Sequence, residues 1–306
     1  MKKRMLALVL VVCVLLCGCT PLVEDDEILE IYASFFPIYA FLDALTEDVP
    51  DINAHCLVQP QDGCLRDYQL SDWDLYLLAS SADAMFMGGR GLESFEGTLF
   101  GWGEQGPVIS AILYNLDLYN QDEEAVGEDA SHFDGPNPHL YMSVNGAKTM
   151  LESMEATIAA IDPGYAHLYS RNLEDAIKGV EELQTIIEET RRAVEGSPVI
   201  IMNEALYYVA DDYGLEIDMV FERESGVALY DSELDACIET IEASVSKVIL
   251  IEKQAPQVFV KALENAGYTV VRIDILSDHR ESEGFGGYIE AQKNNAAAIR
   301  GAFTNN

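Results

Sequence analysis

The sequence predicts an α/β protein with two lobes, each built on a mostly parallel sheet flanked by helices. Short apolar segments of strand length alternate with helical patterns along nearly the whole chain, which is typical of parallel strands joined by crossover helices. A length of 306 residues exceeds the usual single hydrophobic core, which favours two domains. Between the two alternating stretches lies one long charged segment, 162–196, with the periodicity of a single helix.

The first 27 residues precede the predicted fold. Three basic residues and an apolar run of signal-peptide length are followed by Leu16-Cys17-Gly18-Cys19. This tetrapeptide resembles a bacterial lipobox, which predicts removal of a lipoprotein signal, 1–18, and attachment of lipid to Cys19. Residues 19–27 would then form a short tether at the outer surface of the membrane. An ordinary signal peptide and an uncleaved anchor are the alternatives.

The composition excludes one class of partner. Removal of the signal deletes three basic residues and no acidic one, so that the formal charge moves from -35 to -38. Such a charge argues against binding nucleic acid, or an anionic membrane face through the folded surface. Among the later cysteines, Cys56 and Cys64 bracket a loop that is short enough for a disulfide to close, but the sequence does not show whether they face each other, and two separate thiols are favoured over a bridge.

The N-terminal lobe is predicted to span 28–161. Pro37 stands where proline is favoured, at an early helical position. An acidic segment, 117–137, has little apolar content and is interpreted as a solvated loop, with a weak metal-gathering lid as the alternative. Strands are predicted at 28–35, 52–58, 82–87 and 107–112, and helices at 37–42 and 70–79.

The long helix is predicted to begin at Asp162-Pro163 and to end at Gly196, before Ser197-Pro198. Its length of roughly 50 Å, at about 1.5 Å per residue, is too great for a crossover inside one small domain. The C-terminal lobe, 197–306, repeats the alternation of the first. Its strands are predicted at 199–202, 216–221, 247–251 and 268–273, and its helices at 204–212, 232–243, 256–266 and 287–303.

Four polar side chains stand at the ends of strand-like runs. In an open α/β sheet, ligands bind outside the carboxyl ends of the strands, so these four segments are expected to form one cleft. The segments are GCLRDYQLSD from Gly63, NPHLYMS from Asn137, MNEALYYVADDYGL from Met202 and VVRIDIL from Val270.

In order, spacing and surrounding sequence, the four segments resemble the zinc- and manganese-capturing solute-binding lipoproteins of ABC transporters. The resemblance runs from 28 to 303. It implies that 162–196 is a rigid helix joining the lobes, that the partners are a permease and an ATPase, and that zinc or manganese is the cargo, with no bound metal as the alternative. Members carry His, His, His or Glu, and Asp or Glu at the four ligand positions.

His139 and Asp274 match the second and fourth of these ligands, whereas Arg66 and Asn203 depart from the pattern. A guanidinium has no lone pair for a metal, and about 4 Å from a divalent cation it would repel that cation by roughly 8 kcal/mol at an effective dielectric of 20. We therefore expect Arg66 to take the place of the ion and to pair with Asp274. Asn203 can offer only an amide oxygen.

A second arrangement stays open, in which Arg66 points outward and Glu204 or His279 supplies the missing metal donors. Tyr68 and Tyr141 flank the ligand positions and are expected to line the cleft. No nucleophile elbow or His-Glu-x-x-His helix occurs, so the protein is not expected to be an enzyme. The predicted function is that of a monomeric solute-binding subunit of a metal importer. The alternative is the same fold without a transition metal, as a non-metal solute binder or a surface adhesion or interaction lipoprotein.

Overall fold

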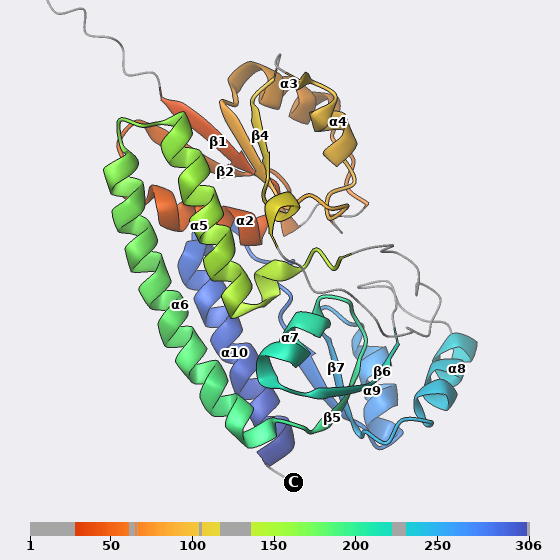
Figure 1. The fold of residues 1–306 in the computed structure, drawn as a ribbon. Coiled ribbons are helices and arrows are strands. Elements are labelled where there is room, and N and C mark those ends of the chain that lie inside the picture. The colour runs from red at the N-terminus through yellow and green to blue at the C-terminus, as the bar shows by residue number, and fades with distance from the viewer. Residues whose placement is uncertain are drawn as a thin grey trace, which may run out of the picture.

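The computed structural model describes residues 28–60, 65, 67–103, 106–116, 136–221 and 231–304. Cys19 and the whole signal, Cys64, Arg66 and most of the acidic segment 117–137 lie outside the described residues, and the expectations for them stay predictions. The described chain forms two lobes joined by long helices, as Figure 1 shows, which confirms the predicted fold class.

The N-terminal sheet has the order β2-β1-β3-β4, and every neighbouring pair is parallel. All four strands fall inside the predicted segments, and each is shorter than predicted. Because the strands are parallel, their carboxyl ends share one edge of the sheet. The strands are β1 (Leu29–Ala33), β2 (Ile52–Cys56), β3 (Ala84–Met87) and β4 (Val108–Ala111).

Three helices and a 3-10 turn complete this lobe: α2 (Phe36–Thr46), α3 (Asp72–Ser81), α4 (Glu96–Phe100) and η3 (Ile112–Asn115). The buried carboxylate of Glu93 links the residues that follow β1 and β3. It accepts hydrogen bonds from the Ser34 hydroxyl at 2.7 Å and from the amides of Gly88 and Gly89 at 2.7 and 2.8 Å. Burial raises the pKa of Glu93 to about 7, although these three hydrogen bonds act in the opposite direction.

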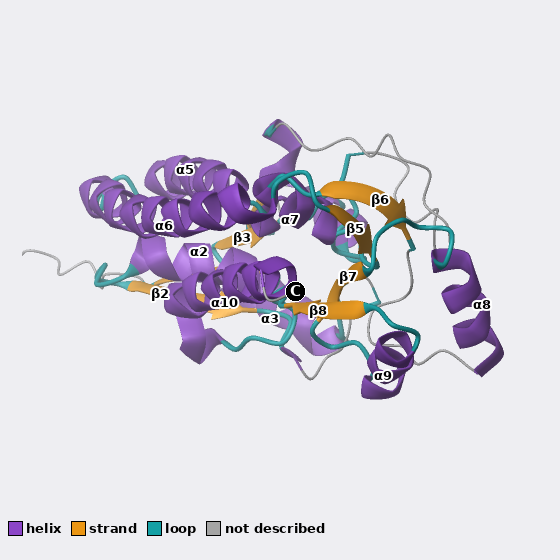
Figure 2. Cartoon of the chain, turned by 90° about the horizontal axis from the view of Figure 1, so that it is seen from below, coloured by secondary structure: helices purple, strands orange, loops and turns teal. Residues whose placement is uncertain are grey.

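The C-terminal sheet repeats this design with the parallel order β6-β5-β7-β8. Figure 2 shows α7 (Leu206–Tyr213) on one side of the sheet and both α8 (Asp231–Ile241) and α9 (Gln257–Asn265) on the other. The strand β7 is buried throughout, as expected for a central strand covered on both faces. The strands are β5 (Pro198–Ile201), β6 (Glu216–Val220), β7 (Val248–Glu252) and β8 (Thr269–Ile273).

Three long helices run along one side of the molecule: α5 (Val144–Ile161), α6 (Ala166–Val194) and α10 (Gly284–Thr304) (Figure 1). The linking helix begins at Ala166 and not at Asp162, because Asp162 stands in the turn after α5, where its carboxylate accepts a hydrogen bond from Tyr169 at 2.6 Å. Helix α10 packs against α2 and α6 as well as against β8, although it follows the last strand of the C-terminal sheet.

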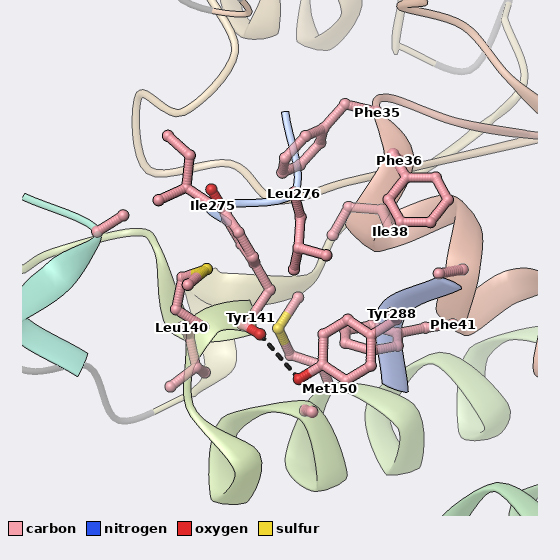
Figure 3. Packing of buried hydrophobic residues seen from close by; sticks show 14 of the residues in the cluster. Phe35, Phe36, Ile38, Phe41, Leu140, Tyr141, Met150, Ile275, Leu276 and Tyr288 are labelled. Carbon is pink, nitrogen blue, oxygen red and sulfur yellow. Dashed lines mark hydrogen bonds between the residues drawn. The ribbon is translucent and has the colours of Figure 1, made fainter. Parts of the chain in front are cut away.

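Direct hydrogen bonds fasten the C-terminal part of the chain to η4 (Leu140–Met142) and to the start of α5. The Asp212 carboxylate on α7 accepts from the Ser143 hydroxyl at 3.0 Å and from the Val144 amide at 2.9 Å. On α10, the Tyr288 hydroxyl donates to the Tyr141 carbonyl at 3.0 Å, which Figure 3 draws as a dashed line. These contacts hold the segment that carries His139 between the two lobes.

Within the described ranges, none of the helices combines the length and the apolar character that a membrane span needs.

Candidate metal-capture site

Most of the described donors lie where parallel strands end, and His139 lies at the start of a 3-10 turn. Asn203 and Glu204 follow β5, Asp274 directly follows β8, and His139 immediately precedes η4. Of the four positions predicted to form the cleft, these three segments can be placed, whereas Arg66 lies outside the described residues. The predicted pairing of Arg66 with Asp274 therefore stays a prediction.

The imidazole of His139 is buried and is oriented by Asn137, two residues earlier. The Asn137 Oδ1 atom lies 3.0 Å from both the His139 backbone nitrogen and the ring Nδ1 atom. An amide oxygen only accepts, so in the neutral imidazole Nδ1 carries the proton and Nε2 carries the lone pair. Fixing one ring nitrogen in this way is how proteins prepare the other to bind a metal.

Glu204, and not Asn203, directs its side chain toward His139. The Glu204 Oε1 atom lies 3.9 Å from the His139 Nε2 atom, with both side chains nearly buried. That distance is too long for a hydrogen bond and close to the roughly 3.3 Å that separates two tetrahedral ligands each about 2.0 Å from one metal. The Asn203 Oδ1 atom instead accepts a hydrogen bond from the Ala205 amide at 2.9 Å, so it supports the turn after β5.

Asp274 is buried and is surrounded by donors. Its Oδ2 atom lies 2.9 Å from the Lys253 Nζ atom and 3.1 Å from the His279 Nε2 atom, and its Oδ1 atom accepts from the Leu276 amide at 2.9 Å. Burial raises the pKa of Asp274, but the hydrogen bonds from His279, Lys253 and the Leu276 amide outweigh it and lower the pKa to about 2. The carboxylate is therefore ionised at neutral pH.

Asp274 is also held through its backbone by Asn295 of α10. The Asn295 Oδ1 atom accepts from the Asp274 amide at 2.8 Å, and the Asn295 Nδ2 atom donates to the Asp274 carbonyl at 2.9 Å. A buried side chain that satisfies both backbone groups fixes the position of the strand end.

His279 completes this second cluster. Its Nδ1 atom lies 2.8 Å from the Glu283 Oε2 atom, and its ring stacks on Phe36 with 4.8 Å between the ring centroids. Burial lowers the pKa of His279, but the hydrogen bond and charge of Asp274, with the charge of Glu283, raise it overall. In this structure His279 therefore serves as an ion-pair partner of Asp274.

Apolar and aromatic side chains from several segments pack together next to the predicted ligands in the sequence. Figure 3 shows Tyr141 beside Ile275 and Leu276, with Phe35 and Phe36 extending from the start of α2. The Tyr141 ring lies 5.8 Å from the His139 ring and 5.3 Å from the Phe35 ring, between centroids. Tyr141 thus lies beside a predicted ligand, and its role in lining a cleft stays a prediction.

Tyr68, the other tyrosine predicted to line the cleft, contacts residues of the N-terminal lobe. Its hydroxyl donates to Asp74 of α3 at 2.9 Å, and its ring meets Phe95 edge-on at 6.0 Å.

The donors thus form two groups, His139 with Glu204, and Asp274 with His279. Asp274, Asp278 and His279 place one ligand atom each within 4.8 Å of the others. Among the described residues, this is the set of three or more histidine, cysteine or acidic side chains that meets that distance. A metal shared by both groups would therefore require movement of the side chains or of the segments that carry them.

Three residues with a part in this geometry are absent from the sequence-based prediction. Asn137 orients His139, Asn295 holds the backbone of Asp274, and Lys253 pairs with its carboxylate. Lys253 follows the apolar run 248–251 and Glu252, and a polar pair after such a run predicts a position at the carboxyl edge of the sheet.

The family is established by comparison with known proteins. The model of the family described as "Zinc-uptake complex component A periplasmic" matches residues 31–302. The chain therefore belongs to this family of extracytoplasmic solute-binding proteins of ABC transporters, and it is not an enzyme. Among curated relatives, the manganese-binding lipoprotein MntA of Halalkalibacterium halodurans is 21% identical, with 96% of this chain and 97% of the relative covered. The zinc uptake protein ZnuA of Bacillus subtilis is 22% identical over 61% of this chain and 59% of the relative.

Solved structures agree on the fold. FpvC of Pseudomonas aeruginosa in complex with Mn²⁺ has a TM-score of 0.76 at 19% identity and covers 91% of this chain and 99% of its own. The Zn(II)-bound ZnuA-like domain of AdcA from Streptococcus pneumoniae has a TM-score of 0.74 at 19% identity, with 90% of this chain and 98% of that domain covered. At this identity the likeness concerns the fold of two lobes.

Proposed function

We propose that this protein is the solute-binding subunit of an ABC importer and that it captures zinc or manganese with His139, Glu204, Asp274 and His279. Two imidazole nitrogens and two carboxylates are a donor set that suits either metal. This is the second of the two arrangements that the sequence leaves open. Glu204 takes the role that the family pattern gives to the position of Asn203, and His279 supplies the nitrogen that Arg66 cannot offer.

The orientation of His139 is the observation that supports this proposal most strongly. Asn137 receives the Nδ1 proton, and the Nε2 atom is directed toward the Glu204 carboxylate at 3.9 Å. The two side chains come from segments far apart in the sequence, and each is mostly enclosed, with 11% and 13% of the side chain exposed. An imidazole nitrogen and a carboxylate oxygen at this separation are suited to share one metal ion.

We further propose that the captured ion brings the two donor groups together. Because the described donors do not converge within 4.8 Å, capture would rotate His279 away from Glu283 or move the 276–283 segment toward His139. The hydrogen bonds from Ser143 and Val144 to Asp212 favour a local rearrangement of this kind over a movement of α7 relative to the start of α5.

The remaining parts of the proposal concern location and partners. The lipobox-like sequence at Cys19 and the lipoprotein name of one relative support a protein anchored by lipid to the outer face of a bacterial membrane. The family supports a permease and an ATPase as partners. We propose a monomer with no affinity for nucleic acid, in line with the strongly negative charge.

Calorimetric titration of chelator-treated residues 20–306 with Zn²⁺ and Mn²⁺ tests the proposal. His139→Ala and Glu204→Gln should each weaken binding on the order of 100-fold or more, since even a residue that only orients a ligand is worth 10- to 100-fold. Asn203→Ala is the matched control and should stay within about tenfold of the unmodified protein. Equal losses in Asn203→Ala and Glu204→Gln would assign the donor to Asn203 and contradict the proposal.

A second function remains relevant because the Asp274 carboxylate is already satisfied by Lys253 and His279 without a metal. If the unmodified protein takes up neither ion, this closed arrangement favours a non-metal solute binder or a surface interaction lipoprotein.

A further inference from the structure

Lys253 lies at the same sheet edge as the proposed site. It follows β7, and its backbone amide donates to the Ile273 carbonyl at 2.7 Å, which places it beside the end of β8. Its ammonium lies 2.9 Å from the Asp274 Oδ2 atom and 3.7 Å from the Asp278 Oδ2 atom. The side chain of Lys253 is half exposed, whereas that of Asp274 is only 10% exposed.

The ammonium occupies a lone pair that a metal would use. The Asp274 Oδ2 atom interacts with both Lys253 and His279, and the Oδ1 atom accepts from the Leu276 amide. A metal ion approaches a carboxylate oxygen to about 2.0–2.2 Å, closer than an ammonium at 2.9 Å. A divalent ion bound to that oxygen would lie so close to the ammonium that the two would repel each other strongly.

We propose that Lys253 is a tethered cation that neutralises Asp274 in the metal-free protein and moves onto Asp278 when a divalent ion is captured. This inference rests on the proposed function and adds to it a residue that sets the affinity. The half-exposed stem of Lys253 can swing, and the second carboxylate stands within ion-pair distance to receive it. Capture is then an exchange of one cation for another, so the charge at Asp274 is never left uncompensated.

The chain offers a matched control at the other end of the same strand. Lys247 precedes β7 and places its ammonium over the ring of Tyr268, 4.6 Å from the centroid. Lys247→Met changes the net charge of the protein as much as Lys253→Met does, but it leaves Asp274 paired. Lys253→Arg keeps a cation at the site.

The experiment is a titration of residues 20–306 with ZnCl₂ and MnCl₂ by calorimetry. Lys253→Met should bind at least tenfold more tightly than the unmodified protein, whereas Lys247→Met and Lys253→Arg should stay within about threefold. Tight binding by Lys253→Met with none by the unmodified protein would support Lys253 as the blocking cation and contradict metal capture by the natural chain. Equal binding by Lys253→Met and the unmodified protein would overturn the role of Lys253 while leaving metal capture intact. Binding by neither would overturn both.

Asp278 needs its own test because it could also be a ligand. Asp278→Asn should weaken binding in the unmodified background and have no effect in the Lys253→Met background, as a double-mutant cycle measures. A similar loss in both backgrounds would make Asp278 a ligand and overturn its role as the acceptor of Lys253.

Discussion

Asp212 links α7 to the start of α5, and Asp212→Asn is expected to change how stability depends on pH. The carboxylate accepts hydrogen bonds from Ser143 and Val144 in a mostly buried position. Burial raises its pKa from 3.8 to about 6, against the effect of these hydrogen bonds. Because the folded pKa is above the unfolded one, the contribution of Asp212 to stability is full below pH 3.8 and is lost as the pH rises through 6.

The size of the effect follows from these two pKa values. The whole range corresponds to about 3 kcal/mol, at 1.36 kcal/mol for each pKa unit. Between pH 4.5 and 7.5 the unmodified protein should lose about 2 kcal/mol from this group, and somewhat less if solvent reaches the carboxylate. In Asp212→Asn, the new side chain does not titrate in this pH range. Its NH₂ group would replace a carboxylate oxygen and face the Val144 amide, donor against donor, which lowers the free energy of unfolding by about 1–3 kcal/mol at either pH.

Urea unfolding followed by circular dichroism at pH 4.5 and 7.5 measures the difference. Relative to the unmodified protein, Asp212→Asn should be more destabilised at pH 4.5 than at pH 7.5, by about 2 kcal/mol. Asp211→Asn, at an exposed neighbouring position, is the control and should show the same difference at both pH values within about 0.5 kcal/mol. A pH-independent deficit for Asp212→Asn, or a larger one at pH 7.5, would refute this account of the buried carboxylate.

Four further predictions concern the scaffold and the anchor. Glu93→Ala should lower the free energy of unfolding by about 3 kcal/mol or more at pH 5.5, because three buried donors lose their acceptor. The loss should be smaller at pH 8, because the raised pKa of Glu93 makes burial of its ionised form costly in the unmodified protein. Urea unfolding at both pH values measures the two losses. Gly146→Ala should lower the free energy of unfolding by about 1–3 kcal/mol and weaken metal binding, because a Cβ atom there would lie 2.2 Å from the carbonyl oxygen of Leu140, the residue after His139. A thermal melt and a metal titration that both match the unmodified protein would exclude the clash. Cys19→Ala should prevent lipid attachment and release the protein from the membrane, which fractionation and mass spectrometry detect. X-ray scattering with and without metal should show only a small change in radius of gyration, because the continuous helix 166–194 packs along both lobes, and a large closure would contradict this.

The sequence was sufficient for the fold because local signals and global topology agree in this chain. Apolar runs such as 248–251 lie in strands that are buried on both faces and followed by a helix, which leaves parallel pairing as the consistent arrangement. The start of the long helix was misplaced, since Asp162-Pro163 is a typical helix start but Gly164 continues the turn to Tyr165. Helix termini depend on such local competition and are hard to locate from sequence alone.

The arrangement of the site is harder to predict than the fold, because side-chain direction at a strand end is a tertiary property. Asn203 and Glu204 are neighbours after β5, and only packing determines that Glu204 faces His139 while Asn203 binds the backbone. In the same way, the sequence placed Asp274 at a sheet edge but did not show that Lys253, 21 residues away, would pair with it. The mismatch at Arg66 was visible, whereas the donors that could replace it were recognised only as alternatives.

A crystal structure of residues 20–306 grown with zinc, with the ion located by anomalous scattering, tests the central claim most directly. The account predicts one strong peak within about 2.0–2.2 Å of His139 Nε2, Glu204, Asp274 and His279, with Lys253 moved away from Asp274. A peak bound through Asn203 without Glu204, or no peak and an intact Lys253–Asp274 pair, would contradict it.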